Sequence, residues 1–352
     1  MNNNVKYSIM IPVYNASKFL RECLDSVLVQ EVDDYEVILI NDGSTDDSLS
    51  ICNEYASKDS RFIVIDKKNE GPFIARSHGI KASRGKYLFF LDSDDFWDKD
   101  MLKIVDNALE KFNYPDIIVF NYNSIAENGN FLHKVRNDFP YDKSNLRANY
   151  PNDIFKILVG SDSLNSLWSK VIKRDVVDIS KDSNFGSEIT LGDDLIRTAP
   201  AIIKSQNIVF IDEYLYNYRK NTSSIVHNFN FKHFNSINIV YDYVLSELER
   251  EKDFNQELKI LFNNRRVDTL ISNINVVAIS NTKIGEKKKT LIKIYEDERI
   301  QNLLYNFTNE KYLEKNKTKK ITFWCLKHKM YTFLILVLKL RYNLFVKKRK
   351  NS

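Results

Sequence analysis

The amino-acid sequence predicts an α/β protein with a mostly parallel, Rossmann-like sheet flanked by helices and a helical C-terminal extension. Short apolar runs alternate with helix-like segments through the first 120 residues, which predicts crossover connections between parallel strands. The runs VILI and YLFFL are apolar throughout, as is typical of strands covered on both faces. With 43% hydrophobic and 28% charged residues, the 352-residue chain can bury a large core.

The apolar runs and helical periodicities place the elements in order. Strands are expected at 6–15, 35–40, 62–67, 86–92 and 116–122. Helices are expected at 17–30 with Ser17 as N-cap, from Asp46 or Asp47 to about Ser57, and at 71–83. The first helix carries its apolar residues on one face, which predicts that this face packs on the sheet.

The texture of the sequence changes near residue 220. Segments 231–250, 255–280 and 286–306 are polar and helix-patterned, with few strand signals. We therefore expect an α/β catalytic domain over 1–220, with a donor half (1–95) and an acceptor half (96–220). A helical extension over 221–310 and a tail over 311–352 are expected to follow.

The tail differs from the rest of the chain in charge. Residues 311–352 hold 13 Lys/Arg and one acid, a net charge of +12, whereas residues 1–310 hold 39 Lys/Arg and 46 Asp/Glu, a net charge of −7. The segment 321–346 is rich in aliphatic and aromatic residues, but its longest run without a charge, 330–338, has nine residues. A membrane span needs about 20.

This composition predicts helices that lie on an anionic membrane surface. The alternative is a last helical hairpin packed on the catalytic domain, with a solvated basic end. The long aliphatic runs disfavour nucleic acid as the partner.

The cysteines and the first residues indicate the compartment. Cys23, Cys52 and Cys325 lie far apart and form no ligand-spaced pair, which favours a reducing cytoplasm and argues against a zinc site. The opening MNNNVKYSIMIP has no basic-then-apolar leader. A cytoplasmic protein, peripheral on the inner face of the cell membrane, is therefore expected.

An acidic cluster follows the fourth predicted strand. FFLDSDD places Asp92, Asp94 and Asp95 within four positions, where two charges about 4 Å apart repel by roughly 4 kcal/mol. A Mg²⁺ or Mn²⁺ ion that binds a diphosphate would remove this repulsion. The alternative is a solvated loop or an acidic helix cap. Asp42, after the second strand, could bind a nucleobase or ribose, or simply form a turn before Gly43.

Four motifs carry a resemblance to a known family. SIMIPVYN, VILINDGSTDDS, NEGPFIARSHGI and GKYLFFLDSDD occur in the order and spacing of the inverting family 2 glycosyltransferases, which have the GT-A fold. The match continues more weakly through LNSLWSKVIKRD, LGDDLIRTAPAI and YLYNYRKNTSSI, so that the resemblance covers about two-thirds of the chain. The chain departs from the family at Ser77, where Asn is usual, and at Phe73 and Ile74, where smaller residues are common.

The resemblance implies roles for individual residues. If the resemblance holds, Tyr14 offers an aromatic face to the donor, Asp42 binds uracil, and Asp94 coordinates Mn²⁺ or Mg²⁺. The full set of donor-binding residues is Pro12, Val13, Tyr14, Asp42, Arg76, Asp92 and Ser93.

The family pattern also places a catalytic base in an acidic pair. Asp194, the second acid of the pair after Gly192, would take the proton from the acceptor hydroxyl. Asp193 could instead cap the helix that follows it. Weaker acceptor-binding roles fall on Trp168, Lys170 and Asp193, although a tryptophan here could equally belong to the core.

The stretch YLYNYRKNTSSI (214–225) resembles the family's loop that closes over the diphosphate. The resemblance implies that Tyr216, Tyr218 and Arg219 contribute to this loop. His227 follows it, and a lone histidine in such a context is more often structural or exposed than a metal ligand.

These implications together predict a metal-dependent, inverting hexosyltransferase. It would move a sugar from a UDP-sugar to a glycan or lipid-linked oligosaccharide and form a β-linkage, in capsule, exopolysaccharide, cell-wall or lipopolysaccharide assembly. Association with a second copy or with a partner glycosyltransferase stays open.

Two other functions compete with this one. A phosphatase of the haloacid dehalogenase type would use FFLDSDD as its nucleophile strand and Lys170 as its lysine. It leaves PVYN and NDGSTD without a role, and its Asp-x-Asp strand normally comes first in the chain. A catalytically silent subunit that binds sugar nucleotides is opposed by the set Asp92, Asp94 and Asp194.

Overall fold

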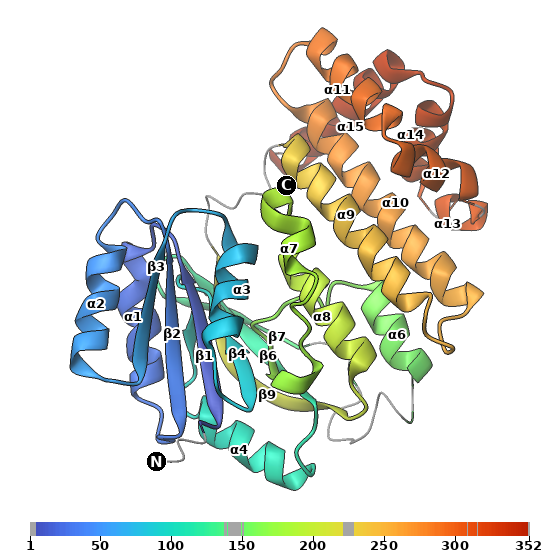
Figure 1. Ribbon diagram of the computed structural model, residues 1–352. Coiled ribbons are helices and arrows are strands. Elements are labelled where there is room, and N and C mark those ends of the chain that lie inside the picture. Colours follow the sequence, from blue (N-terminus) through green and yellow to red (C-terminus); the bar gives the residue numbers. More distant parts are fainter. Residues whose placement is uncertain are drawn as a thin grey trace.

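An α/β unit comes first in the chain and a helical unit follows it (Figure 1). The computed structural model describes residues 5–136, 139, 149, 151–220, 229–307, 309–314 and 316–350. Its strands are β1 (Tyr7–Val13), β2 (Tyr35–Asp42), β3 (Phe62–Lys67), β4 (Tyr87–Phe90), β5 (Phe96–Trp97), β6 (Ile117–Ala126), β7 (Phe131–Val135), β8 (Lys170–Lys173) and β9 (Ile208–Lys220). The helices of this unit are α1 (Ser17–Leu28), α2 (Ser48–Lys58), α3 (Pro72–Ala82), α4 (Met101–Lys111), α6 (Pro151–Gly160), α7 (Asp182–Phe185) and α8 (Asp193–Lys204).

The strands form one sheet in the order β3-β2-β1-β4-β8-β6-β9-β5, and β7 pairs with β6. Strands β1 to β4 are parallel, as predicted from their crossover helices. The short β8 lies antiparallel between β4 and β6, and β9 runs parallel to β6. Six of the nine described strands therefore share one direction, and β5, β7 and β8 oppose it.

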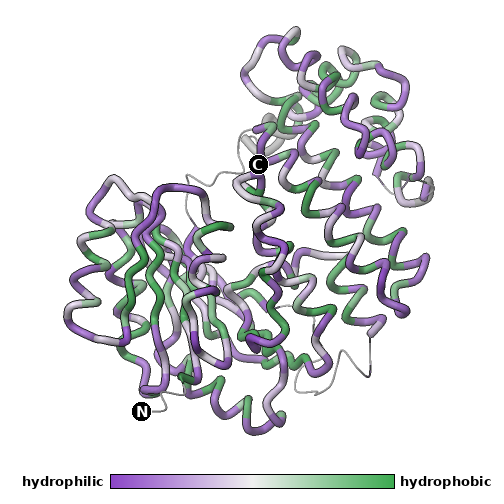
Figure 2. Tube along the Cα trace, viewed as in Figure 1, coloured by the Kyte–Doolittle hydropathy of each residue, from purple (hydrophilic) through white to green (hydrophobic). Residues whose placement is uncertain are grey.

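Helices cover both faces of the sheet, as the unbroken apolar strands predict. Alternate residues of β1, such as Ile9 and Ile11, pack against α1, α2 and α4. The residues between them, such as Met10, face α3, α6, α8 and α9. Figure 2 shows the strands of this sheet as the most continuous hydrophobic part of the α/β unit. The site at the strand ends is thus built on a two-sided core.

Two details differ from the sequence expectation. Ser17 is the first residue of α1 and not its N-cap, because its backbone N–H donates to Asp46 Oδ2 (3.0 Å) and that of Ala16 to Ser48 Oγ (2.9 Å). A side chain of the loop after β2 and one from the first residue of α2 thus accept hydrogen bonds from the start of this helix. Strands β8 and β9 were not predicted, because one is four residues long and the other mixes buried and exposed residues irregularly.

The helical unit has a core of its own. It consists of α9 (Phe231–Leu248), α10 (Gln256–Ile279), α11 (Ile284–Glu296), α12 (Glu298–Asn306), α13 (Glu310–Glu314), α14 (Lys317–Lys327) and α15 (Tyr331–Lys350). Val240, Val244 and Phe262 also belong to the core under the sheet, so that α9 and α10 join the two units.

The tail forms a hairpin of α14 and α15 that packs on α10 and α11. Leu334, Ile335 and Leu338 are buried in the core of the helical unit. This packing matches the hairpin of the alternative expectation, but the hairpin lies on the helical unit and not on the sheet. Within the described residues we find no helix that is both long and apolar enough to cross a membrane.

Candidate active site

The loops after β1 and β2 are joined by hydrogen bonds. Asn15 Oδ1 accepts from the backbone N–H of Thr45 (2.8 Å), and the backbone N–H of Asn15 donates to Ser44 Oγ (3.1 Å). Asn15 adopts a left-handed backbone conformation (φ 49°), which asparagine tolerates better than most residues. The two polar loops therefore form one continuous rim at the carboxyl edge of the sheet, where open α/β sheets bind ligands.

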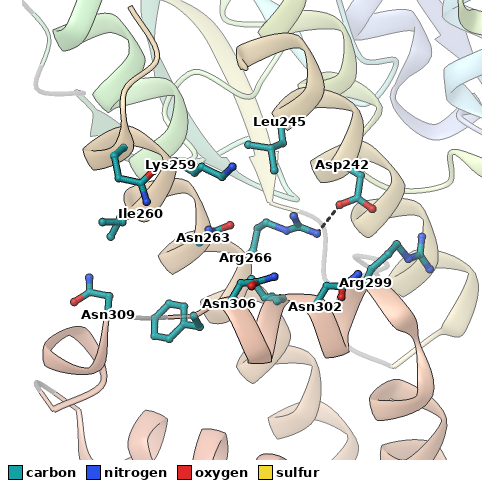
Figure 3. Close-up of a pocket in the computed structure, with 13 residues that line it drawn as sticks. Asp242, Leu245, Lys259, Ile260, Asn263, Arg266, Arg299, Asn302, Asn306 and Asn309 are labelled. Carbon is teal, nitrogen blue, oxygen red and sulfur yellow. Dashed lines mark hydrogen bonds and ion pairs between the residues drawn. The ribbon is translucent and has the colours of Figure 1, made fainter. Parts of the chain in front are cut away.

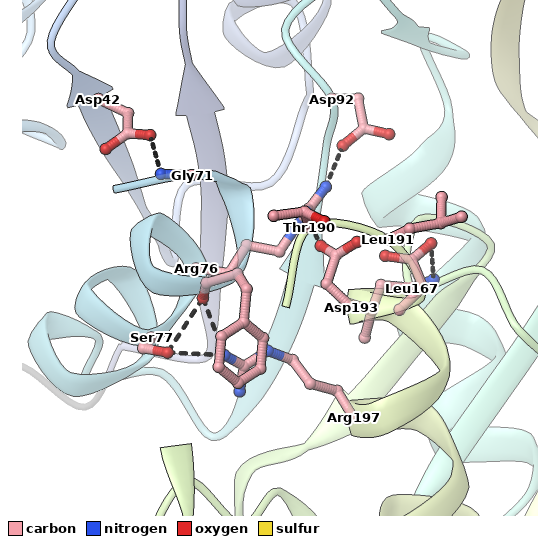
Figure 4. Close-up of polar contacts among 12 residues, drawn as sticks. Asp42, Gly71, Arg76, Ser77, Asp92, Leu167, Thr190, Leu191, Asp193 and Arg197 are labelled. Atoms are coloured by element: carbon pink, nitrogen blue, oxygen red, sulfur yellow. Dashed lines mark hydrogen bonds and ion pairs between the residues drawn. The ribbon is translucent and has the colours of Figure 1, made fainter. Parts of the chain in front are cut away.

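Asp42 lies at the end of β2 and is almost fully buried. Its Oδ1 accepts from Lys67 Nζ (2.5 Å) and from the backbone N–H of Glu70 (3.0 Å), and its Oδ2 accepts from the backbone N–H of Gly71 (2.8 Å; Figure 4). One carboxylate thus fixes the loop between β3 and α3. An ionised carboxylate offers about four acceptor positions, so that these three bonds leave one on Oδ2.

Arg76 connects the acidic loop after β4 to the acidic pair at the start of α8. It stems from α3, is buried, donates through Nη2 to Asp92 Oδ1 (2.6 Å) and pairs through Nη1 with Asp193 (Figure 4). Helix α3 lies close to the sheet, because a Cβ on Gly79 would come within 2.9 Å of Ile40 Cδ1. Arg76 and Asp193 are 117 residues apart in the chain, and their ion pair holds the two segments together.

Charges around Arg76 decide its ionisation. Burial is the largest single influence and acts to lower its pKa, but Asp193, Asp92 and Asp194 together raise the pKa above the usual arginine value. The guanidinium therefore stays charged at the centre of three carboxylates. It supplies a positive charge beside the acidic cluster.

The acidic pair opens helix α8. Gly192 precedes it with φ 85°, a conformation that glycine adopts without strain, and Asp193 is the first helical residue. Asp194 Oδ2 accepts a hydrogen bond from the backbone N–H of Leu167 (3.2 Å). Burial raises the pKa of Asp194 to about 7, Asp193 adds to the increase, and Arg76 opposes it. A carboxylate with this pKa suits proton abstraction near neutral pH.

Lys170 supports the turn that holds Asp194. It has no exposed surface, and its Nζ donates to the Ser166 carbonyl (2.5 Å) and to Ser169 Oγ (3.3 Å). Burial lowers its pKa to about 7, against the opposing effect of Asp194. Because Lys170 is this deeply buried, it influences Asp194 through the turn at residues 166–167 and through its charge. The contact of Lys170 with the acceptor that the sequence predicts stays untested.

Residues of β9 hold the acidic loop after β4 in place through hydrogen bonds. Tyr216 donates through its hydroxyl to Asp95 Oδ2 (2.8 Å), and the backbone N–H of Arg219 donates to Asp95 Oδ1 (2.7 Å). Arg219 Nε donates to the Asp94 carbonyl (2.9 Å), and Nη2 pairs with Glu22 (2.6 Å). Burial, together with the charges of its neighbours in the loop, raises the pKa of Asp95. Asp95 and Arg219 are therefore structural supports of this loop.

Aromatic side chains line the neighbouring part of the site. Trp168 stacks on Tyr216 (ring centroids 4.6 Å apart) and on Tyr218 (5.5 Å), and Tyr122 meets it edge to face. Trp168 is only partly buried, and Tyr218 is 37% exposed. Among the donor residues expected from the first loop, Tyr14 is 53% exposed, whereas Val13 is buried.

A cation would have few protein ligands here. The described residues contain no group of three or more His, Cys, Asp or Glu side chains placed to hold a metal ion. Asp92 and Asp94 are partly exposed, and Asp92 Oδ2 accepts no hydrogen bond from the described residues. Mg²⁺ is commonly bound by one or two carboxylates together with substrate phosphates, so that the side chains present fit such an ion.

The structure brings most of the predicted residues together. The three loops converge, and the acidic pair joins them through Arg76. His227 lies outside the described residues. The sequence reasoning missed Lys67 and the buried ion pair of Arg197 and Asp182 (3.0 Å). Both members of this pair form hydrogen bonds with Ser77. An arginine within the apolar helix LIRTAPAII was the available signal for that pair.

Comparisons with known proteins identify the family. The model of "Glycosyl transferase family 2" matches residues 8–166. GlyG of Streptococcus pneumoniae is described as a glycosyltransferase and is 30% identical over 230 residues, which are 62% of this chain and 72% of GlyG. The chain belongs to glycosyl transferase family 2. This membership sets the phosphatase alternative aside, since the four matching motifs lie within the family domain.

Other comparisons concern length and fold. GlyA of S. pneumoniae, also described as a glycosyltransferase, is 30% identical over 227 residues, which cover 62% of this chain but 31% of GlyA. The crystal structure of Staphylococcus aureus TarS 1-349 in complex with UDP-GlcNAc matches with a TM-score of 0.65 at 18% identity, over 96% of this chain and 92% of that one. The expected GT-A fold is thereby confirmed, and the match extends into the helical unit.

Proposed function

We propose that this chain is a metal-dependent, inverting glycosyltransferase that moves a hexose from a UDP-sugar to a cell-surface glycan acceptor. The observation that supports it best is the bridge that Arg76 makes between Asp92 and Asp193, beside Asp194. The bridge links a donor-side acid to the acidic pair that contains the candidate base. An inverting transfer needs both groups, on opposite sides of the anomeric carbon.

Asp194 takes the role of base in this proposal. Its carboxylate accepts the proton of the acceptor hydroxyl while the hydroxyl oxygen forms a bond to the anomeric carbon. The bond from that carbon to the diphosphate oxygen breaks at the same time, and UDP leaves with the electron pair. An α-linked donor then yields a β-linked product.

Asp42 and the first loop hold the nucleoside. The acceptor position left on Asp42 Oδ2 suits the N3–H of uracil, and the exposed ring of Tyr14 offers a flat face to the base. Pro12, Val13 and Ser93 complete the donor wall expected from the family. The UDP-GlcNAc complex of TarS, which shares the fold, supports a uridine donor.

Asp94, next to Asp92, would hold Mn²⁺ or Mg²⁺. When bound, the ion neutralises charge on the departing diphosphate. The described chain supplies the rest: Arg219 and Tyr216 fix the loop that carries Asp94, and Arg76 keeps Asp92 oriented. We place the acceptor against Trp168 and Tyr218, whose rings stack beside the acidic pair.

The test is UDP release by the purified chain with UDP-Glc, UDP-Gal, UDP-GlcNAc and UDP-GalNAc, each with Mn²⁺ and with a chelator. One donor is expected to be turned over, with loss of turnover in the chelator. Asp94→Asn should lose the metal-dependent rate. Asp194→Asn should keep UDP binding in calorimetry and lose transfer by about 10²–10⁴-fold. UDP binding without turnover of any donor by the wild-type chain would favour a silent subunit.

We further propose that the tail places the enzyme on an anionic membrane. Outside its buried stripe, α15 exposes Phe333, Leu336, Leu340 and Leu344, which follow a spacing of three and four residues on one face. Trp324 of α14 is 50% exposed. This apolar stripe, within a tail of net charge +12, has the composition of a helix that lies in a lipid interface.

Vesicle flotation tests the membrane role. The wild-type chain is expected to float with vesicles that contain phosphatidylglycerol and to stay behind with phosphatidylcholine alone. Leu336→Glu with Leu340→Glu should abolish flotation without lowering Tm, because both side chains are more than half exposed. Ile284→Glu, an exposed position on α11, is the matched control. Equal flotation of the double variant would refute the role of the stripe.

A further inference from the structure

The helical unit contains a cavity that the proposed chemistry does not use. It has a volume of about 610 Å³ and lies between the end of α9, the first half of α10 and α12 (Figure 3). Cavities of roughly 300–1,000 Å³ commonly bind small molecules or parts of larger ones. Its size therefore suits one or two sugar-sized units.

The lining is dominated by carboxamides and cations. It is formed by Gln256, Asn263, Asn302, Asn306 and Asn309, by Lys259, Arg266 and Arg299, by the single acid Asp242, and by Leu245, Ile260, Leu303 and Phe307. Each carboxamide both donates and accepts hydrogen bonds, as does a sugar or polyol hydroxyl. Arginine guanidinium groups bind phosphate or carboxylate through paired N–H donors. The lining thus suits a hydroxyl-rich chain that bears anionic groups.

Several of these polar groups have unused hydrogen-bonding capacity. Arg299, Asn302 and Asn306 share one face of α12, and both asparagine side chains make no hydrogen bond within the described part of the chain. Arg299 gives Nε and Nη2 to Asp297, which leaves Nη1. Arg266 is 92% buried, pairs with Asp242 (2.6 Å), and its Nε has no partner among the described groups. A buried donor without a partner is costly unless a ligand or water supplies one.

Helix α9 connects the cavity with the segment that carries the acidic pair. Ser236 of α9 donates to the carbonyl of Leu191 (2.6 Å) and accepts from its backbone N–H (3.0 Å). Asp242 lies six residues further along the same helix, or about 9 Å along its axis.

We infer that this cavity binds an anionic segment of the acceptor glycan, remote from the hydroxyl that receives the sugar. The inference rests on the proposed function, because it assigns the ligand as the acceptor of that reaction. Phosphate-bearing and carboxylate-bearing glycans share the required chemistry. The cavity then sets which acceptor chains are used, while the crevice around Arg76 performs the transfer.

Calorimetry without any donor tests the binding. The probes are glycerol phosphate oligomers, short hyaluronan oligosaccharides and neutral maltodextrin oligosaccharides, titrated into the full chain. At least one anionic probe is expected to bind, more weakly as salt increases, and the neutral probe to bind at least about tenfold more weakly. Equal binding of neutral and anionic probes, or binding of no probe, would overturn the inference.

Surface variants locate the site. Asn302→Ala with Asn306→Ala should weaken binding of the anionic probe about tenfold, by loss of two hydrogen bonds. Arg299→Gln should weaken the anionic probe and leave any neutral binding unchanged. Gln301→Ala is the matched control, since Gln301 is exposed on α12 outside the cavity lining. Because both asparagines are exposed, an unchanged Tm is expected. Unchanged affinity in the double variant would place the ligand elsewhere and refute the inference.

Turnover without acceptor separates this inference from the proposed function. Hydrolysis of the UDP-sugar should be unchanged in the double variant, whereas KM for the acceptor should rise about tenfold with kcat retained. An inactive wild-type chain that still binds the anionic probe through Asn302 and Asn306 would remove the transferase function and leave the site. An active chain whose acceptor KM ignores the variants would remove the site and leave the function.

Discussion

The ionisation of Asp194 gives the sharpest test of the site. If its carboxylate is the base, the rate follows the deprotonated fraction, which for a pKa of about 7 is about one tenth at pH 6 and about nine tenths at pH 8. The value of kcat/KM for the acceptor should therefore rise about tenfold between these pH values. The rise with pH follows from the sign of the equilibrium, since the active form is the unprotonated one.

The two charged neighbours of Asp194 should move the rising limb of the pH–rate profile, the part in which kcat/KM increases with pH, in opposite directions. Asp193 raises the pKa of Asp194, so that Asp193→Asn should shift the limb to lower pH. Arg76 lowers that pKa, so that Arg76→Gln should shift the limb to higher pH even though the variant is slower. Rates are measured over pH 5.5 to about 9 with initial-rate UDP release. A flat profile in the wild-type chain, or shifts of the same sign in both variants, would refute the assignment.

Other predictions concern the supports of the site. Lys170→Met should lower kcat by about 10-fold or more, because the turn that holds Asp194 loses the Lys170 side chain that bonds to it. The KM for the UDP-sugar should stay unchanged, which serves as the control. An unchanged kcat would contradict the positioning role of Lys170. Arg219→Lys should raise the Mn²⁺ concentration needed for half-maximal activity. Lysine cannot make both contacts of the Arg219 guanidinium, one to the Asp94 carbonyl and one to Glu22. An unchanged Mn²⁺ requirement would contradict the role of Arg219 in holding the loop of Asp94.

Much of the first half of the fold was predictable from local pattern. The strands β1, β2 and β4 are buried along almost their whole length, and α1 has one apolar side, so that period and spacing together predict parallel crossovers. The later strands depend on tertiary context. In β9, buried Leu215 and Tyr216 are neighbours, and the register with β6 shifts near its middle. An alternation that breaks in this way resembles a loop when only the sequence is considered.

The site was predictable as a set of acids but not as a network. The position of Asp92 at a strand end and the pairing of Asp193 with Asp194 are visible in the sequence. That Arg76 joins the two groups depends on how closely α3 approaches the sheet, which no local pattern encodes. The same holds for the burial of Lys170 and its hydrogen bond to the Ser166 carbonyl, and the predicted contact of Lys170 with the acceptor stays untested.

The helical extension is part of the wall of the site, although the sequence presents it as a separate segment after residue 220. Ser236 of α9 accepts from the backbone N–H groups of Thr190 and Leu191 (both 3.0 Å) and donates to the Leu191 carbonyl. A Cβ on Gly192 would meet Ile237 Cδ1 at 2.9 Å, so that the backbone entering the acidic pair lies directly against α9. The orientation of the candidate base therefore depends on helix packing outside the catalytic fold, and ligand binding along α9 has a direct structural route to it.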